Sequence, residues 1–179
     1  MTAPVPSASA VAAEIRNRQD QMIPQVKLHK LLYYVQAYHL VWERTPAFAE
    51  DIEAWERGPV VADLWRREKS SRSQLGRDDF VPDTVRNTVT NVLHRCESMT
   101  GIDLTIATHA EDPWSEATDG GRNVCSQVIS HESLIAYFSR ESSDVRRMKE
   151  SLETFRDDAP FQPDPPGALD ALLAGHSAA

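Results

Sequence analysis

The chain has 179 residues, of which 41% are hydrophobic and 26% charged, and its formal net charge is -8. A chain of this length can bury about two thirds of its unfolded surface in one compact domain, so one domain is expected. The acidic balance argues against a general nucleic-acid binder, because such proteins neutralise phosphates with lysine and arginine.

The sequence also indicates a cellular compartment. No run approaches the roughly 18 apolar residues that a membrane span requires, and residues 1–13 lack a basic segment followed by an apolar core. Cys96 and Cys125 are the only cysteines, and they lack the spacing of a zinc or dithiol motif. We therefore expect no membrane association and a cytoplasmic location with free thiols.

Two helices are predicted near the start of the chain. Ala8, Val11, Ala12 and Ile15 recur at helical spacing and predict a helix that ends near residues 18–21. A second helix has Pro24 in its first turn and is apolar or aromatic on more than half of its circumference, so we expect it to lie at the centre of the fold. Its two stripes are Leu28, Leu31, Leu32, Val35, His39 and Trp42, and Lys27, Lys30, Tyr34, Tyr38 and Val41.

The next segment is predicted to contain an extended stretch and a helix. Residues 48–57 lack a helical stripe and lie between turn signals, which favours an extended segment or a short strand. Gly58 and Pro59 are typical of a helix start, and the apolar spacing that follows predicts a helix to about Lys69. Residues 70–79 are polar and are predicted to form a loop.

Two further helices are predicted from their first residues. Pro82 opens a helix to about residue 98, and the apolar stripe of this helix comprises Val85, Val89, Val92, Cys96 and Met99. Thr100 and Asp103 have the spacing of an N-cap and its acidic partner, which predicts a short helix over residues 101–108.

The remaining elements are predicted from turn and cap signals. Asp112 before Pro113 is typical of a cap followed by a first-turn proline. Residues 124–129 are expected to be extended, and Ser130 is expected to cap the helix that follows. A last helix is marked by the apolar spacing of Val145, Met148, Leu152 and Phe155.

These predictions define a mainly α fold class. We expect a compact single-domain helical bundle with one or two short extended or β segments, around residues 51–56 and 124–129. The domain is expected to span residues 10–157, after a flexible N-terminus at residues 1–9. Residues 158–179 are dense in proline and are predicted to form a disordered tail.

The densest group of potential metal ligands is His109, Glu111 and Asp112. Three neighbouring groups in a loop point in different directions, and Asp112 already has a predicted capping role. We therefore expect no metal site and no cofactor. A small metal-dependent hydrolase that uses these three residues is the enzymatic alternative.

No catalytic residue is predicted. His39 lies in an apolar stripe and is expected to pack with one ring nitrogen satisfied. Cys96 lies on an apolar helical stripe, where a thiol behaves as a small hydrophobe. The glycines do not form the Gly-Lys-Ser/Thr pattern of a phosphate-binding loop. The protein is therefore predicted not to be an enzyme.

One stretch departs from the acidic balance. Its basic residues are Arg57, Arg66, Arg67, Lys69, Arg72 and Arg77. They are compatible with a stripe that attracts an acidic partner or a phosphate, but the favoured interpretation is a solvated helix face and loop.

Three segments carry a resemblance to a known family. The first, Lys27 to Tyr34, reads KLHKLLYY, and the second, Phe48 to Val60, reads FAEDIEAWERGPV. The third combines Thr108-His109 with Pro113-Trp114. Their order and spacing resemble the Panacea domain, a family of bacteria and phages that includes SocA-like antitoxins and GepA-like phage-associated proteins. The resemblance covers roughly residues 24–115.

The sequence departs from the family in places. His29 stands where the family usually has glutamine, and no basic residue follows closely after Trp114. Many members also carry an additional N-terminal DNA-binding module. About ten residues precede the first predicted helix here, so we expect no autorepression and no direct nucleic-acid binding by this chain alone.

The resemblance implies an antitoxin that binds and silences a cognate protein toxin by direct contact. Large amphipathic side chains of the kind that anchor interfaces occur within the matching segments. The candidate protein-binding residues are Lys27, Lys30, Tyr34, Tyr38, Glu53, Trp55, Arg57, Gly58, Pro59, Trp65, His109 and Trp114.

The end of the chain suggests an alternative. It finishes His176-Ser177-Ala178-Ala179, and small apolar ends of this kind resemble the terminal signals that bacterial unfoldases read. The alternative function is therefore a proteolytic adaptor that delivers a bound protein to a Clp-type protease, or a substrate of such a protease.

Overall fold

One helix organises the fold. The structure is a computed structural model that describes residues 5–70, 80–124 and 126–141. Helix α2 (Gln25–Glu43) begins after Pro24, and all of its residues from Leu28 to Leu40 are buried. A helix that is buried around its whole circumference must be covered on every side. The prediction of a central helix is therefore confirmed.

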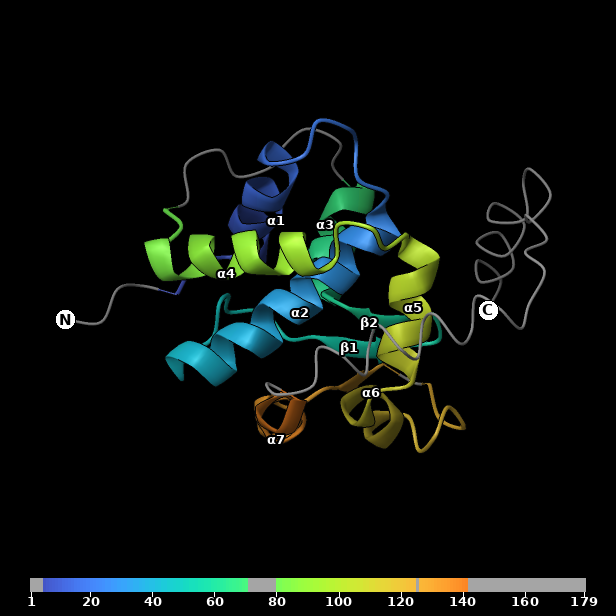
Figure 1. Cartoon of the computed structure of the whole chain (residues 1–179). Helices are drawn as coiled ribbons and strands as arrows, with labels where there is room; N and C mark the ends of the chain where they lie inside the picture. The colour runs from blue at the N-terminus through green and yellow to red at the C-terminus, as the bar shows by residue number, and fades with distance from the viewer. Residues whose placement is uncertain (1–4, 71–79, 125, 142–179) are drawn as a thin grey trace. The chain divides into compact units, whose positions relative to one another are not determined.

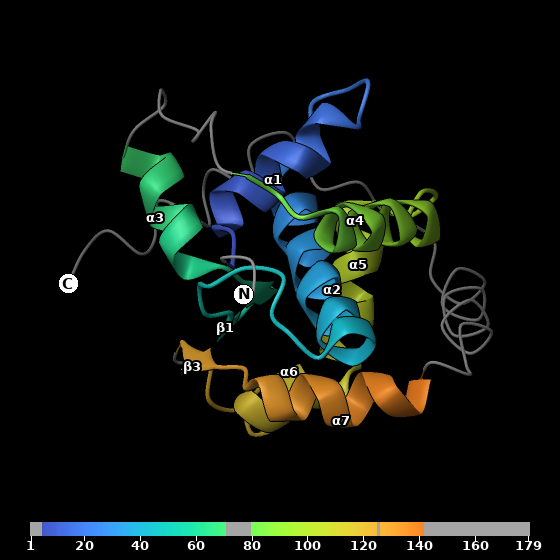
Figure 2. The same cartoon turned by 90° about the vertical axis from the view of Figure 1, so that its left-hand side faces the viewer.

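Elements from both ends of the described chain pack against α2. They are α1 (Ala8–Asn17), β2 (Gly58–Val60), α4 (Asp83–Arg95), α5 (Gly101–His109) and α7 (His131–Glu141). Figures 1 and 2 both show α1 and α7 on opposite sides of α2. In Figure 2, α4 and α5 cover a third side. The described part of the chain is mainly helical, as the sequence predicts.

A small antiparallel sheet completes the layer around α2. Strand β1 (Glu53–Trp55) lies between β2 and β3 (Gln127–Val128). In the β1–β2 pair, Glu53 lies opposite Val60 and Trp55 opposite Gly58, while in the β1–β3 pair Glu53 lies opposite Val128. The two extended segments predicted around residues 51–56 and 124–129 are thus confirmed, and they pair with each other.

The start of the next helix differs from the prediction. Gly58 and Pro59 form strand β2, and α3 (Ala62–Ser70) begins only after Val61. Gly58 has a φ of 92°, which is outside the right-handed helical region, and its segment pairs with β1. The helix start predicted at Gly58-Pro59 is wrong because strand pairing, a tertiary contact, overrides a local signal.

Two of the predicted helix caps are confirmed and one is displaced. The hydroxyl of Thr100 and the carboxylate of Asp103 form a complete capping box at the start of α5. Ser130 Oγ accepts from the Ser133 backbone N–H, 3.1 Å away, at the start of α7. The N-cap of α6 (Asp112–Ala117) is Glu111, so Asp112 occupies the first turn instead of the cap position.

The apolar stripe of α4 packs inward, while the last turn of α2 emerges. The stripe residues Val85, Val89, Val92, Cys96 and Met99 are all buried, as predicted, although α4 ends at Arg95, before the predicted residue 98. Trp42 was expected in the buried stripe of α2 but is 39% exposed. It lies two residues before the left-handed Arg44 that ends the helix, where the Tyr38 ring and the Arg95 guanidinium stack against it.

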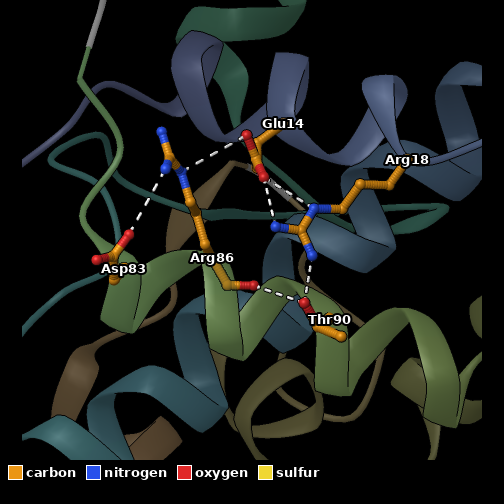
Figure 3. A network of polar contacts seen from close by, with 5 residues as sticks. All are labelled: Glu14, Arg18, Asp83, Arg86 and Thr90. Atoms are coloured by element: carbon orange, nitrogen blue, oxygen red, sulfur yellow. Dashed lines mark hydrogen bonds and ion pairs between the residues drawn. The ribbon is translucent and has the colours of Figure 1, made fainter.

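A polar network joins α1 to α4 at the surface (Figure 3). Glu14 accepts from Arg18 at 2.8 Å and lies 4.0 Å from the Arg86 guanidinium. Arg18 also donates to Thr90, and Arg86 pairs with Asp83. Because these groups are partly or largely exposed, each pair contributes about 1 kcal/mol at most. The network therefore links the two helices but adds little to the stability of the fold.

Several predictions fall outside the described residues. They concern most of the polar loop at residues 70–79, Cys125, the helix around residues 145–155 and the tail at residues 158–179. Within the described ranges, no helix is long and apolar enough to cross a lipid bilayer.

A buried amide ties α2 to the segment before the sheet. Gln36 Oε1 accepts from the backbone N–H groups of Ala47 (2.8 Å) and Phe48 (3.3 Å), and its Nε2 donates to the Phe48 carbonyl at 3.2 Å. Gln36 is fully buried. Its side chain therefore satisfies three backbone groups that have no access to water.

We predict that Gln36→Leu lowers the free energy of unfolding by about 2–4 kcal/mol, because it leaves these backbone groups buried without partners. Urea unfolding of the purified variant measures the change. Gln19→Leu is the matched control, since Gln19 is exposed. Equal losses in the two variants would contradict this role of the Gln36 amide.

Candidate functional site

The site is built around the β1–β2 hairpin, which we define as residues 53–60. Its two strands are joined by an exposed two-residue turn, Glu56 and Arg57, while Gly58 and Pro59 are buried. Two paired strands of three residues are too short to be stable alone in water. The hairpin therefore depends on groups outside it.

Side chains from three helices hydrogen-bond to the hairpin backbone. Lys30 Nζ of α2 donates to the Pro59 carbonyl at 3.0 Å. Trp114 Nε1 of α6 donates to the Trp55 carbonyl at 2.9 Å. The ring of His109, the last residue of α5, bonds to the backbone of Glu56. The turn is thus anchored on both of its strands.

A fourth contact holds the segment immediately after the hairpin. The His29 Nδ1 atom accepts from the Val61 N–H at 3.2 Å. Burial, with the charges of Lys30 and Arg16, lowers the pKa of His29 to about 3. The ring is therefore neutral near pH 7 and carries its proton on Nε2, which is buried and has no hydrogen-bond partner among the described residues.

The close approach of Lys30 requires a glycine in the hairpin. A Cβ atom on Gly58 would lie 2.8 Å from Lys30 Cε and 2.9 Å from Thr108 Oγ1. The φ of 92° at Gly58 also disfavours any other residue. Two independent constraints, backbone conformation and space, therefore act at this position.

Lys30 is a buried cation. Its side chain is 1% exposed, and no carboxylate of the described chain lies within ion-pair distance of it. Burial lowers the pKa of Lys30 to about 7. The amine is therefore close to its titration point at neutral pH, beneath the backbone of the hairpin.

His109 links the hairpin to Trp114. The two rings stack with their centroids 4.0 Å apart and an interplanar angle of 24°. Burial and the charge of Lys30 lower the pKa of His109, and the bond to the Glu56 backbone partly offsets this. The Nε2 atom is buried and has no partner in the described part of the chain. His109 is thus engaged as a neutral ring in packing.

A second polar centre lies between α2 and the start of α6. Glu111 is 5% exposed, and its two carboxylate oxygens accept from the hydroxyls of Tyr33 and Tyr34, each at 2.7 Å. Burial, followed by the charge of Glu111, raises the pKa of both tyrosines well above the usual range. The tyrosines therefore remain protonated donors, and the carboxylate is held by them.

Two half-buried tryptophans meet at the hairpin, Trp55 from strand β1 and Trp65 from α3. The rings of Trp55 and Trp65 meet edge to face with centroids 5.9 Å apart, and Trp65 also packs against His29. Trp55 Nε1 donates to Glu53 at 2.8 Å, and Arg66 pairs with the same carboxylate at 3.4 Å. The ring pair is thus fixed in orientation while part of its surface faces solvent.

The structure gathers nine of the predicted binding residues at the hairpin. They are Lys30, Glu53, Trp55, Arg57, Gly58, Pro59, Trp65, His109 and Trp114. Tyr34 and Tyr38 lie in the core against Phe138, and Lys27 lies beside Gly101 at the start of α5. These three are not part of the hairpin cluster.

The same twelve residues fall into three burial classes. Lys30, Tyr34, Tyr38, Gly58, Pro59 and Trp114 are buried. Lys27, Glu53, Trp55, Trp65 and His109 are half-buried, and Arg57 is exposed. Buried side chains of this kind act on a partner only through the neighbours that they hold in place.

Glu111, Tyr33 and Thr108 belong to these polar clusters but were not among the predicted binding residues. Glu111 was considered only as a metal ligand, and Tyr33 only as part of a sequence match. The one signal in the sequence was the position of Glu111 between the His109 and Pro113-Trp114 parts of the third segment. Its two partners lie 77 and 78 residues away, beyond the reach of local patterns.

The proposed metal ligands do not converge. His109 stacks on Trp114, Glu111 is held by two tyrosines and Asp112 is exposed. Over the described ranges, no three histidine, cysteine or acidic side chains are grouped as a metal site would require. Cys96 is also buried among packed side chains. Burial raises the pKa of its thiol to about 12, so the thiol is protonated at neutral pH.

His39 packs as predicted, with Nδ1 2.9 Å from Thr88 Oγ1.

Two residues of the basic stretch, Arg66 and Arg67, are paired with carboxylates of the described chain. Arg66 pairs with Glu53 and Asp63, and Arg67 lies 3.8 Å from Glu50. Arg72 and Arg77 lie outside the described residues. The ion pairs favour the interpretation of a solvated helix face.

The fold and site define a helical domain that presents a firmly held β-hairpin. Residues 28–115 match the model of the family described as antitoxin SocA-like, Panacea domain. Comparisons with curated proteins and with solved structures return no match. Through residues 28–115, the chain belongs to the SocA-like Panacea-domain family. The matched segment contains the hairpin, its three helical donors and Glu111.

We predict that Glu111→Gln lowers the free energy of unfolding by about 1–3 kcal/mol, because an amide accepts through one oxygen only and loses the charge that strengthens both bonds. Guanidinium unfolding measures this loss. The control is Glu116→Gln, an exposed change on the same helix. Tyr33→Phe should then cost less in the Glu111→Gln background than in the unaltered protein, and additive losses would contradict the coupling.

The lowered pKa of Lys30 predicts a pH dependence of stability. The unfolded chain binds more protons than the folded one between the folded pKa of about 7 and the usual 10.5, so stability rises with pH through this window. Between pH 6 and 8.5 the gain relative to Lys30→Met should be on the order of 1–2 kcal/mol.

Unfolding curves of the unaltered protein and Lys30→Met at several pH values check this prediction. Parallel profiles for the two proteins would show that Lys30 does not titrate in this range. NMR titration of the unaltered protein is a direct readout that needs no variant. The chemical shift of the Lys30 Cε carbon should titrate near pH 7 instead of above pH 10.

Proposed function

We propose that the protein is an antitoxin that neutralises a cognate protein toxin by binding it directly. The match of residues 28–115 to the SocA-like Panacea domain carries this proposal. It implies a protein partner and a role that needs no catalysis. We further propose that binding takes place in the bacterial cytoplasm.

The chemistry of the site supports binding over catalysis. The buried polar groups are engaged in holding backbone or side chains: Lys30 bonds to Pro59, and Glu111 to two tyrosines. What remains accessible near the hairpin is a half-buried tryptophan pair beside charged side chains. Aromatic rings within a polar rim are typical of protein interfaces.

The predicted role as an adaptor for a Clp-type protease depends on the tail at residues 158–179. Those residues lie outside the described part of the chain. The adaptor role therefore stays a prediction from the sequence, and the described residues add nothing to it.

The proposal predicts the outcome of co-expression with the product of the adjacent gene. That product alone should arrest growth, and co-expression of this chain should restore growth and yield a stoichiometric complex. An adjacent product that is harmless alone, or one that stays toxic and uncomplexed in the presence of this chain, would count against the proposal.

A matched pair of tryptophan variants sharpens the test. Trp55→Ala should weaken the complex by roughly 30-fold, the effect of losing an aromatic anchor worth about 2 kcal/mol. Trp42→Ala is the control, because Trp42 is more exposed than Trp55 but lies at the far end of α2. Calorimetric titration measures both affinities, and circular dichroism verifies that both variants are folded.

A further inference from the structure

The exposed turn of the hairpin is held far more firmly than a surface turn requires. Only Glu56 and Arg57 of the hairpin are exposed, yet the backbone of Trp55, Glu56 and Pro59 is bonded to side chains of α6, α5 and α2. Connecting segments usually run over the protein surface and are more mobile than the elements that they join. The position of this turn is set from three directions.

The side chains that hold the turn include groups that destabilise the fold. A lysine is buried without a carboxylate in reach in the described chain, and the His109 Nε2 atom is buried without a partner there. Each of these two features costs free energy. Local violations of folding rules that cluster at one place are typical of functional sites. The turn is therefore the part of the surface that the cluster serves.

The turn presents both signs of charge side by side. Within the described residues, neither Glu56 nor Arg57 takes part in an ion pair, whereas Arg66 and Arg67 are engaged with carboxylates of their own chain. A guanidinium binds a carboxylate through two parallel hydrogen bonds. Arg57 is thus available for an acceptor on another molecule, and Glu56 for a donor.

From this geometry we infer that the Glu56–Arg57 turn, flanked by the Trp55 and Trp65 rings, is the element that contacts the toxin. It fits a folded protein surface with a carboxylate opposite Arg57, a basic side chain opposite Glu56 and an apolar recess for the ring edges. This inference rests on the proposed antitoxin function and adds to it the contacting element and the chemistry of the partner surface.

A protein partner fits this turn better than a nucleic acid. Phosphates would be attracted by Arg57 but repelled by the adjacent Glu56, and the net charge of -8 adds to that repulsion. A protein surface supplies both signs within a few ångströms. The two charges together therefore select a patterned protein surface.

Charge reversal at the turn tests the inference. Arg57→Glu should weaken the complex with the adjacent gene product by at least about tenfold, because it places a carboxylate opposite a carboxylate. Arg122→Glu is the matched control, since Arg122 is 77% exposed and lies outside the matched segment. That control should change affinity by less than about threefold. Both changes are at the surface, and thermal unfolding verifies that both variants fold.

The outcomes separate this inference from the proposed function. If the unaltered chain binds the toxin and Arg57→Glu binds it equally well, the turn is not the contact and the antitoxin function stands. If the unaltered chain binds no adjacent product, both are overturned. Binding of mixed-sequence DNA or RNA oligonucleotides that Arg57→Glu abolishes would also overturn the inference, because it would assign the turn to phosphates.

Discussion

Donation of hydrogen bonds from helix side chains to the backbone of one short hairpin is the interaction on which the site depends. Lys30 and Trp114 reach carbonyls on opposite strands, and His109 reaches the turn between them. The strands alone pair over three residues each, too few for independent stability. The hairpin exists in this position because α2, α5 and α6 hold it there.

The same constraint explains the electrostatics of the domain. Lys30 must enter the interior to reach the hairpin, so its ammonium loses water and its pKa falls toward neutrality. Glu111 is likewise drawn inside, where two tyrosine hydroxyls replace its solvent. Both groups lie within the segment that matches the Panacea family. That segment therefore specifies a packing arrangement, and we propose that its exposed turn contacts the partner.

Much of the helical framework was predictable because its signals are local. The capping box of Thr100 and Asp103 and the inward stripe of α4 involve residues three or four positions apart, which any helix brings together. Strand β2 was mistaken for a helix start because Gly58-Pro59 satisfies a local helix signal, while its actual state depends on pairing with β1. Nine of the twelve predicted binding residues lie in the hairpin or against it, since the family resemblance covers both the hairpin and the helices that hold it.

The sequence by itself determined the mainly helical class, the central position of α2, most helix boundaries and the family, because periodicity, caps and motif order are carried by neighbouring residues. Only the tertiary structure decided that Lys30 is buried under Pro59, that Glu111 is held by Tyr33 and Tyr34, and that Trp42 is partly exposed. Burial and long-range bonding depend on partners that lie tens of residues away. Their effect on charge and exposure appears only once the chain has folded.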